Sequence, residues 1–258
     1  MSGKIYDVAI IGAGHNGLVT ATYLAKAGQK VIVLEASDRI GGAAVTREFA
    51  PGFKASGVAH ILHALHPKVV SDLGLRLEQT AIGTSVLLPE SKSIEISRDA
   101  SATAASIAAI SKADAEAWPR VTARLTKLAS ALGTFLTRTP PSPAISANDF
   151  QTKLALAMFA LQVRMLGKKD MLELTRILTM NVADLANDFF ESDAIKGLLS
   201  LDATLGVYLG PRSPNTVFNL LYRLSSYGKH GMGGLFLPKG GMGAVAKALE
   251  DAARKAGA

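Results

Sequence analysis

Three glycines near the N-terminus have the spacing of a loop that binds a dinucleotide. Gly12, Gly14 and Gly17 form the pattern G-x-G-x-x-G, directly after the apolar run Asp7–Ile11. In such a loop the first glycine permits a tight turn, the second lets the backbone approach a pyrophosphate, and the third lets a helix pack closely on the strands. The N–H groups and the partial positive charge of that helix N-terminus attract phosphate. The alternative is a glycine-rich turn of some other α/β fold.

A carboxylate in the right place gives this motif more weight. Glu35 ends a second apolar, β-branched run, Val31–Glu35, and follows Gly17 by 18 residues. A carboxylate at that point accepts hydrogen bonds from both hydroxyls of an adenosine ribose, and its charge repels a 2′-phosphate. The sequence therefore disfavours NADP at this site.

A second glycine turn follows immediately, in the residues Asp38–Gly42 (DRIGG). Gly41 and Gly42 permit close backbone approach, and Arg39 can pair with a phosphate or order the loop; an ordinary surface loop is the alternative. We expect His15 to contribute its backbone rather than its ring. The predicted cofactor-binding residues are Gly12, Ala13, Gly14, His15, Asn16, Gly17, Glu35, Ala36, Arg39, Gly41 and Gly42.

The elements that must position these residues form a βαβ unit. The sequence predicts a strand over Asp7–Ile11, a helix over Gly17–Ala27 and a strand over Val31–Glu35. Gly28 suits the left-handed conformation that ends a helix. Because a helix connects the two strands, they should be parallel.

The rest of the chain is predicted to be mainly helical. Ser85–Ile96 has two apolar runs around a polar turn, which indicates a hairpin, and the tail indicates a glycine turn, a short strand, a second glycine turn and a helix. Helices are predicted over 101–110, 113–137, 150–166, 171–187 and 216–226, with breaks at 139–143 and 208–215. We expect an α/β fold: a Rossmann-like domain with an incomplete parallel sheet at 1–70, a mainly helical α+β substrate or cap insertion at 71–230, and a return segment at 231–258.

Composition narrows the chemistry. The chain has no cysteine, which excludes disulfides, thiolate metal sites and a cysteine nucleophile, so redox chemistry would need a cofactor. The net charge is +7 and the pI about 9.6, but the Lys and Arg residues are scattered, so nucleic acid is not an expected partner. No secretory signal is visible, and we expect a cytoplasmic protein.

Three histidines raise the question of a metal. His60, His63 and His66 are spaced by three, and three imidazoles can bind zinc. Pro67 follows directly, however, and no carboxylate is near. We therefore expect no metal and a loop or helical turn near the cofactor, in which His60 can form a hydrogen bond beside a substrate.

The run 153–166 is apolar nearly all round. Such a helix is usually buried in a core. The alternative is a helix that faces lipid or a hydrophobic substrate, with Arg164, Lys168 and Lys169 at phospholipid headgroups. At 13 residues, the most apolar stretch, Leu154–Leu166, is shorter than the roughly 20 residues that a membrane span requires.

The segment VAIIGAGHNGLVTATYLAKAGQKVIVLEASDRIGG resembles the N-terminus of FAD-dependent oxidoreductases of the phytoene desaturase and amine oxidase superfamily. In that superfamily an Arg-x-Gly-Gly turn follows the glutamate and lies near the flavin-side phosphates. Four later segments resemble the phytoene-dehydrogenase-like subgroup: Pro51–His60, Ser111–Arg120, Gly210–Leu221 and Leu237–Ala258.

The resemblance implies FAD as cofactor and hydride transfer from a small or lipophilic substrate to the flavin. Members are about twice as long and carry a later FAD motif that nothing here matches, so we expect an N-terminal portion of a longer enzyme. Two alternatives stay open: a non-catalytic FAD-binding or interaction module, and an NAD-dependent dehydrogenase. The sequence singles out no catalytic side chain and no oligomeric state; peripheral contact with a membrane is an expectation alongside the small-molecule substrate.

Overall fold

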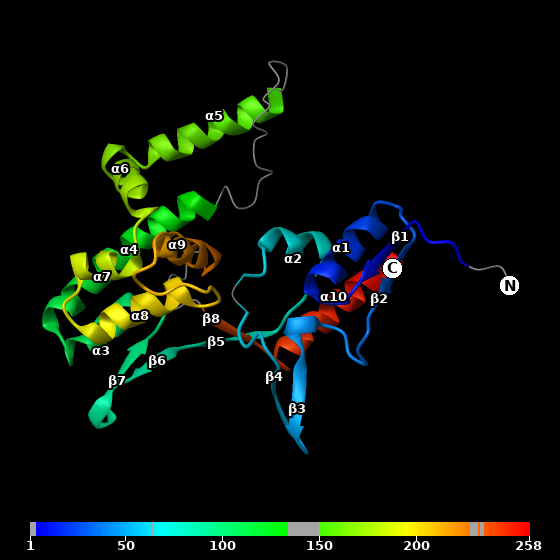
Figure 1. Ribbon diagram of the computed structural model, residues 1–258, viewed down its shortest axis with the longest axis horizontal. Helices are drawn as coiled ribbons and strands as arrows, with labels where there is room; N and C mark the ends of the chain where they lie inside the picture. Colours follow the sequence, from blue (N-terminus) through cyan, green and yellow to red (C-terminus); the bar gives the residue numbers. More distant parts are fainter. Residues whose placement is uncertain (1–3, 63, 134–149, 228–231, 233–234) are drawn as a thin grey trace. The chain divides into compact units, whose positions relative to one another are not determined.

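The structure, a computed structural model, describes residues 4–62, 64–133, 150–227, 232 and 235–258. The chain divides into two compact units (Figure 1). Unit 1 consists of residues 1–82 and 235–258, and unit 2 of residues 83–234. The predicted break at 139–143 lies outside the described residues.

Unit 1 begins with the predicted βαβ arrangement. Strand β1 (Val8–Ile11) pairs in parallel with β2 (Val31–Leu34), in a register that joins Val8 to Val31, and helix α1 (His15–Lys26) connects them. Gly28 follows α1 with φ +86°, the left-handed conformation expected for a residue that ends a helix. The helix starts two residues earlier than predicted, because Gly14 is extended and serves as its N-cap.

The last helix of the chain, α10 (Met242–Ala256), completes the core of unit 1. Its apolar residues recur at the spacing of one helix face, and this face packs against α1. Leu18 and Leu249 lie buried in one cluster, while Ala21, Val31 and Ala253 form a second. Small side chains at the second cluster let α10 approach α1 and β2 closely.

Short elements complete unit 1. The 3-10 turn η1 (Gly42–Ala44) leads into the antiparallel pair β3 (Thr46–Ala50) and β4 (Phe53–Ser56), and α2 (Pro67–Leu73) follows. Strand β5 (Gln79–Ile82) pairs antiparallel with β8 (Leu235–Pro238). This pairing places residues 71–82 in unit 1, whereas the sequence prediction began the insertion at residue 71.

Unit 2 consists of one hairpin and helices. The predicted hairpin is present as β6 (Thr84–Leu87) and β7 (Ser93–Ile96), joined through η2 (Pro89–Ser91). The helices described in this unit are α3 (Ala100–Ala108), α4 (Lys112–Gly133), α5 (Phe150–Met165), α6 (Lys168–Ile177), α7 (Val182–Phe189), α8 (Asp193–Thr204) and α9 (Thr216–Tyr227).

The prediction of one helix over 171–187 was wrong. Helix α6 ends at Ile177, and a turn separates it from α7. Asn181 has an extended backbone, and its side chain accepts a hydrogen bond from the N–H of Asp184, so it caps the N-terminus of α7. An Asn side chain competes with the helical backbone in this way and favours an N-cap. Helix α8 was also missed by the sequence prediction.

Two buried polar contacts join the helices of unit 2. The carboxylate of Asp114, which is 1% exposed, accepts hydrogen bonds from the N–H groups of Glu191 (2.8 Å) and Ser192 (2.9 Å) at the start of α8. The hydroxyl of Thr216 accepts one from the N–H of Val182 at 2.8 Å. These side chains satisfy backbone donors near the starts of α7 and α8, of which the N–H of Val182 is buried.

Candidate functional site

The first glycine loop has the geometry of a tight strand-to-helix turn. Gly12 has φ +96°, and its N–H donates to the carbonyl of Leu34 at 2.7 Å, so the loop leaves β1 beside the end of β2. A Cβ on Gly17 would lie 2.2 Å from the carbonyl oxygen of Gly12. The fold itself therefore requires glycine at position 17, because α1 crosses this turn at contact distance.

Gly14 is a different case. Its φ of −71° is accessible to any residue, and a Cβ there would meet only the Cα of Gly42, at 4.0 Å. No side chain caps α1, and its first turn carries no acidic residue. Neither conformation nor packing explains this glycine, and its missing side chain leaves the N–H groups of the α1 N-terminus open. This arrangement fits an approaching pyrophosphate.

The second glycine turn lies directly against the first. The N–H of Gly41 donates to the carbonyl of Ala13 at 2.8 Å, and Gly14 and Gly41 form an isolated parallel bridge. A Cβ on Gly42 would lie 3.2 Å from the Cα of Gly14. The structure thus brings the two predicted glycine turns together at the N-terminus of α1.

Helix α10 fixes the other side of this second turn. Gly41 has φ +115°, and a Cβ on it would lie 2.8 Å from the Cβ of Ala246. The last segment of unit 1, predicted as a segment that returns to the FAD-binding domain, thereby supports the second glycine turn. The contact spans most of the chain, so no local sequence pattern could have revealed Ala246.

Glu35 is anchored at the end of β2. Its Oε2 accepts a hydrogen bond from the N–H of Ala13 at 2.7 Å, and its Oε1 accepts from the N–H of Ser37 at 3.0 Å and from the Ser37 hydroxyl at 3.1 Å. The backbone N–H of Ser37 and then that of Ala13 lower the pKa of Glu35 below its usual value, because they stabilise the charged form. The carboxylate is exposed, and with about four acceptor positions it can still bind further donors.

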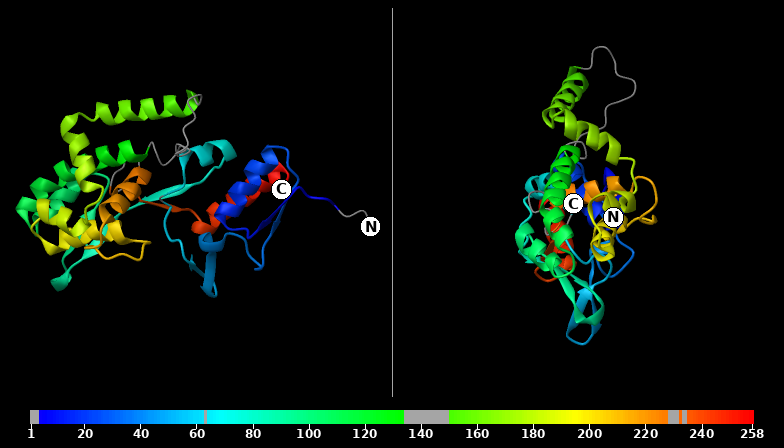
Figure 2. Two further views of the ribbon diagram at one scale, coloured as in Figure 1. Left: turned by 45° about the horizontal axis from the view of Figure 1, so that its top comes forward. Right: turned by 90° about the vertical axis from the view of Figure 1, so that its left-hand side faces the viewer.

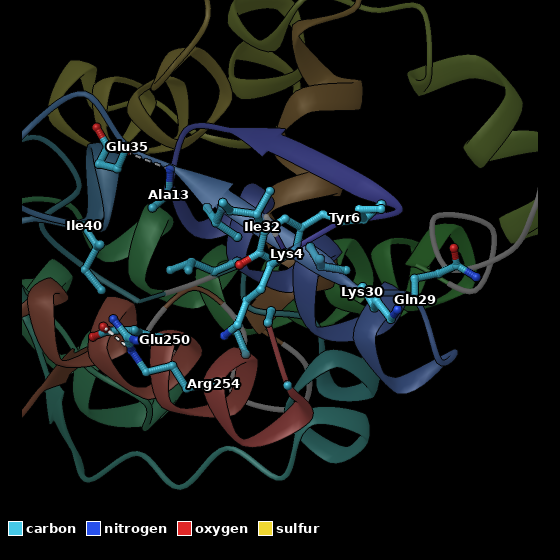
Figure 3. Close-up of a pocket in the computed structure, with 17 residues that line it drawn as sticks. Lys4, Tyr6, Ala13, Gln29, Lys30, Ile32, Glu35, Ile40, Glu250 and Arg254 are labelled. Atoms are coloured by element: carbon cyan, nitrogen blue, oxygen red, sulfur yellow. Dashed lines mark hydrogen bonds and ion pairs between the residues drawn. The ribbon is translucent and has the colours of Figure 1, made fainter. Parts of the chain in front are cut away.

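Glu35 and Ala13 also border a cavity of about 680 Å³. Figure 3 shows Glu35 and Ile40 at one end of it and the Glu250–Arg254 pair of α10 farther along. The N-terminal segment, β2 and the C-terminal half of α10 supply the lining, which combines aliphatic side chains with Lys4, Lys30 and Arg254. Cavities of this size accommodate ligands of the size of a nucleoside.

Arg39 lies at the surface. Its Nε is 3.6 Å from Asp38 Oδ2, and 56% of its side chain is exposed. Its carbonyl oxygen accepts a hydrogen bond from the Ser37 hydroxyl at 2.5 Å. This contact involves only the backbone of Arg39, so both predicted roles of its side chain, pairing with a phosphate and ordering the loop, stay predictions. The remaining predicted residues His15, Asn16 and Ala36 are exposed beside the same turns. Sequence reasoning missed Ser37, whose N–H and hydroxyl both donate to Glu35.

The glycines of the last turn are explained by Thr46. A Cβ on Gly241 or Gly243 would lie 2.8 Å from Thr46 Oγ1, which accepts a hydrogen bond from the N–H of Gly243 at 2.9 Å. The residues of this turn therefore contact β3, and a threonine hydroxyl lies at the N-terminus of α10.

The histidines do not form a cluster in the described residues. His66 caps α2, its Nδ1 accepting a hydrogen bond from the N–H of Lys68 at 3.1 Å, and His63 lies outside the described residues. Within the described part of the chain, no three His, Cys, Asp or Glu side chains are placed to hold a metal ion. Nor is any described helix long and apolar enough to cross a membrane.

The sequence profile of the family described as flavin-containing amine oxidoreductases matches residues 17–257. The chain belongs to this family. Its cofactor is FAD, and the chemistry of the two glycine turns and of Glu35 is compatible with the phosphates and ribose of that dinucleotide. The alternative of an NAD-dependent dehydrogenase is therefore not retained.

Several curated proteins are similar to this chain, some of them over nearly its whole length. Pyridine nucleotide-disulfide oxidoreductase domain-containing protein 2 from Mus musculus is 30% identical over 272 residues, and its Rattus norvegicus counterpart 31% over 270. A limonene dehydrogenase protein of Castellaniella defragrans is 38% identical over 124 residues, which cover 44% of this chain and 22% of that protein. The first two matches cover 98% of this chain and 46% of each relative, so the chain spans about half their length.

Solved structures share the fold. Putrescine oxidase bound to putrescine has a TM-score of 0.58 at 18% identity, and the match covers 97% of this chain and 50% of that one. Cyclohexylamine oxidase from Brevibacterium oxydans has a TM-score of 0.53 at 19% identity, with coverage of 98% and 50%. At these identities the likeness establishes the Rossmann-like fold and no substrate.

Proposed function

We propose that this chain provides the FAD-phosphate site of an oxidoreductase that oxidises a small or lipophilic organic substrate. When bound, FAD supplies the acceptor for a hydride from a substrate C–H bond. The single observation that carries the proposal concerns Gly14. Neither its backbone conformation nor its packing requires glycine, and it lies between an uncapped helix N-terminus and the Gly41–Gly42 turn.

Each part of the site has a separate task. The N–H groups at the start of α1 would bind the pyrophosphate, and Gly41 and Gly42 would let the flavin side approach. Glu35, held ionised by Ala13 and Ser37, would accept hydrogen bonds from the ribose hydroxyls. We assign no catalytic side chain, because the sequence singles out none and hydride transfer to a flavin does not require a protein base.

The lipophilic substrate class is supported by the limonene dehydrogenase relative, whose name refers to a hydrocarbon. It agrees with the resemblance of the later segments to phytoene-dehydrogenase-like proteins. The solved relatives named for amines point instead to amine oxidation, but they share less than a fifth of their residues with this chain. The cytoplasmic location stays a prediction.

A second candidate is a non-catalytic FAD-binding or interaction module. A solved structure of Rab GDI from Plasmodium falciparum has a TM-score of 0.55 and covers 99% of this chain, at 12% identity. A fold shared with a protein of that name does not by itself imply redox chemistry.

Anaerobic spectroscopy distinguishes the two candidates. The chain is incubated with FAD, separated from free FAD by gel filtration, and mixed with a terpenoid alcohol or with an aliphatic amine. Bleaching of the flavin absorbance by the terpenoid supports the oxidoreductase with a lipophilic substrate. Bleaching by the amine would show that the substrate is an amine instead. Retained FAD that neither compound reduces would favour the module, and a chain that retains no FAD would overturn both.

A further inference from the structure

Helix α5 exposes a continuous apolar stripe. Its exposed fractions are 73% at Phe150, 49% at Leu154, 46% at Met158, 57% at Leu161 and 78% at Met165. At about 100° of rotation per helical residue, these five side chains fall within an arc of about 80°. Large apolar side chains scattered singly over a surface need no explanation, but a stripe along a whole helix indicates a binding face.

The protein contacts this helix from the opposite side. Leu156 and Val163 are half-buried, and their helical positions lie roughly 190° from the middle of the stripe. Among the described elements, the neighbouring α6 is the main one in contact with α5, and this contact is small. Figures 1 and 2 show α5 apart from α4 and α9, whose buried leucines form the core of unit 2.

Three cations lie at the C-terminal end of the stripe, and the sequence from 150 to 169 has no acidic residue. Arg164, at one edge of the stripe, and Lys168 and Lys169, just beyond its end, are exposed. The next carboxylate, Asp170, lies 2.5 Å from Lys127 Nζ and 3.5 Å from Arg124, so it does not compensate these charges. A surface that is apolar in the middle and cationic at its edge is complementary to anionic lipid.

The length of α5 defines how it would bind. Sixteen residues rise about 24 Å, and no described helix is long and apolar enough to span a bilayer. A helix with these properties lies in the plane of the interface, its apolar face among the acyl chains and its cations at the headgroups.

We propose that the apolar stripe of α5 inserts into the surface of an anionic phospholipid bilayer and holds unit 2 there as a peripheral membrane module. The proposal does not depend on FAD. It gives a lipophilic substrate a route from the bilayer to the enzyme, but binding can be measured without any substrate.

Vesicle flotation of the 258-residue chain tests the proposal. We expect binding to vesicles of phosphatidylcholine with phosphatidylserine, weaker binding at high salt, and little binding to phosphatidylcholine alone. The variant Met158→Glu with Leu161→Glu places two charges in the stripe and should reduce the partition coefficient about tenfold or more. Far-UV circular dichroism of this variant should match the wild type, since both positions are exposed.

The matched control is Phe49→Glu with Phe53→Glu in unit 1, which changes two exposed apolar side chains and the net charge in the same way. This variant should bind the anionic vesicles nearly as well as the wild type. Equal losses in both double variants would show a general charge effect and overturn the proposal. A wild-type chain that does not bind the vesicles would also overturn the proposal. If that chain formed dimers in analytical ultracentrifugation, and Met158→Glu with Leu161→Glu abolished them, the stripe would be a protein interface.

Discussion

Replacing Gly14 by serine should separate the fold of this site from its ligand. Position 14 has φ −71°, and a Cβ there has 4.0 Å to its nearest neighbour, the Cα of Gly42, so a serine side chain fits without strain. Serine is also a better N-cap than glycine by a few tenths of a kcal/mol. We therefore expect Gly14→Ser to leave the free energy of unfolding of the FAD-free chain unchanged or slightly higher.

FAD binding should change in the opposite direction. The serine Oγ would occupy the open space and accept the hydrogen bond that an N–H of α1 otherwise offers to phosphate. Losing one hydrogen bond to a charged group costs about 1.5–3 kcal/mol, which corresponds to a decrease in FAD affinity of roughly 10- to 150-fold.

Two measurements on the same preparations decide the matter: urea denaturation without FAD, and a fluorescence titration with FAD. Gly197→Ala in α8 is the control, because a Cβ there also meets no neighbour within 4 Å and the position lies in unit 2. Its FAD affinity should equal that of the wild type. If Gly14→Ser were as stable as the wild type and bound FAD equally well, the pyrophosphate would not lie at the α1 N-terminus.

Three further changes test other parts of the account. Gly17→Ala should lower the free energy of unfolding by about 1–3 kcal/mol in urea denaturation, since its Cβ would overlap the Gly12 carbonyl; unchanged stability would contradict the close packing. The pKa of Glu35 is lowered in the folded chain, so its anchoring contacts stabilise the fold at pH values above its ordinary pKa of 4.5 and are lost as pH falls through the lowered pKa. FAD affinity should therefore be constant from pH 8 to about 5.5. Glu35→Gln should weaken FAD binding across that range, and an affinity equal to that of the wild type would refute the role of Glu35 at the ribose. Asp114→Ala should lower the free energy of unfolding by about 1.5–3 kcal/mol, because the N–H groups of Glu191 and Ser192 lose a charged acceptor. The exposed Glu116→Ala on the same helix should have little effect; similar thermal unfolding of both variants would argue against a stabilising role of these two hydrogen bonds.

Local sequence patterns predicted the parts of the fold that depend on neighbouring residues. The βαβ start, the hairpin and the last strand and helix follow from apolar periodicity and from glycine at positions such as Gly28, where the backbone requires a positive φ. The break before α7 was missed because apolar residues continue across it, and the capping side chain of Asn181 decided the outcome.

The candidate site was predictable as far as its motifs reach. The two glycine turns and Glu35 are visible in the sequence, and the structure places them side by side. The contacts that support them were not visible: Ala246 and Thr46 act on glycines roughly 200 positions away in the chain. Nor could the motif alone distinguish Gly17, which the fold requires, from Gly14, which neither its conformation nor its packing requires.

The central claim is that this chain holds FAD at the α1 N-terminus and Glu35. Its most direct test is an equilibrium titration of the 258-residue chain with FAD, followed by flavin fluorescence and repeated in the presence of NADP. We predict saturable binding of one FAD per chain, with NADP unable to displace it because the charge of Glu35 repels a 2′-phosphate. Failure to bind FAD, or displacement of FAD by an equal concentration of NADP, would contradict the account.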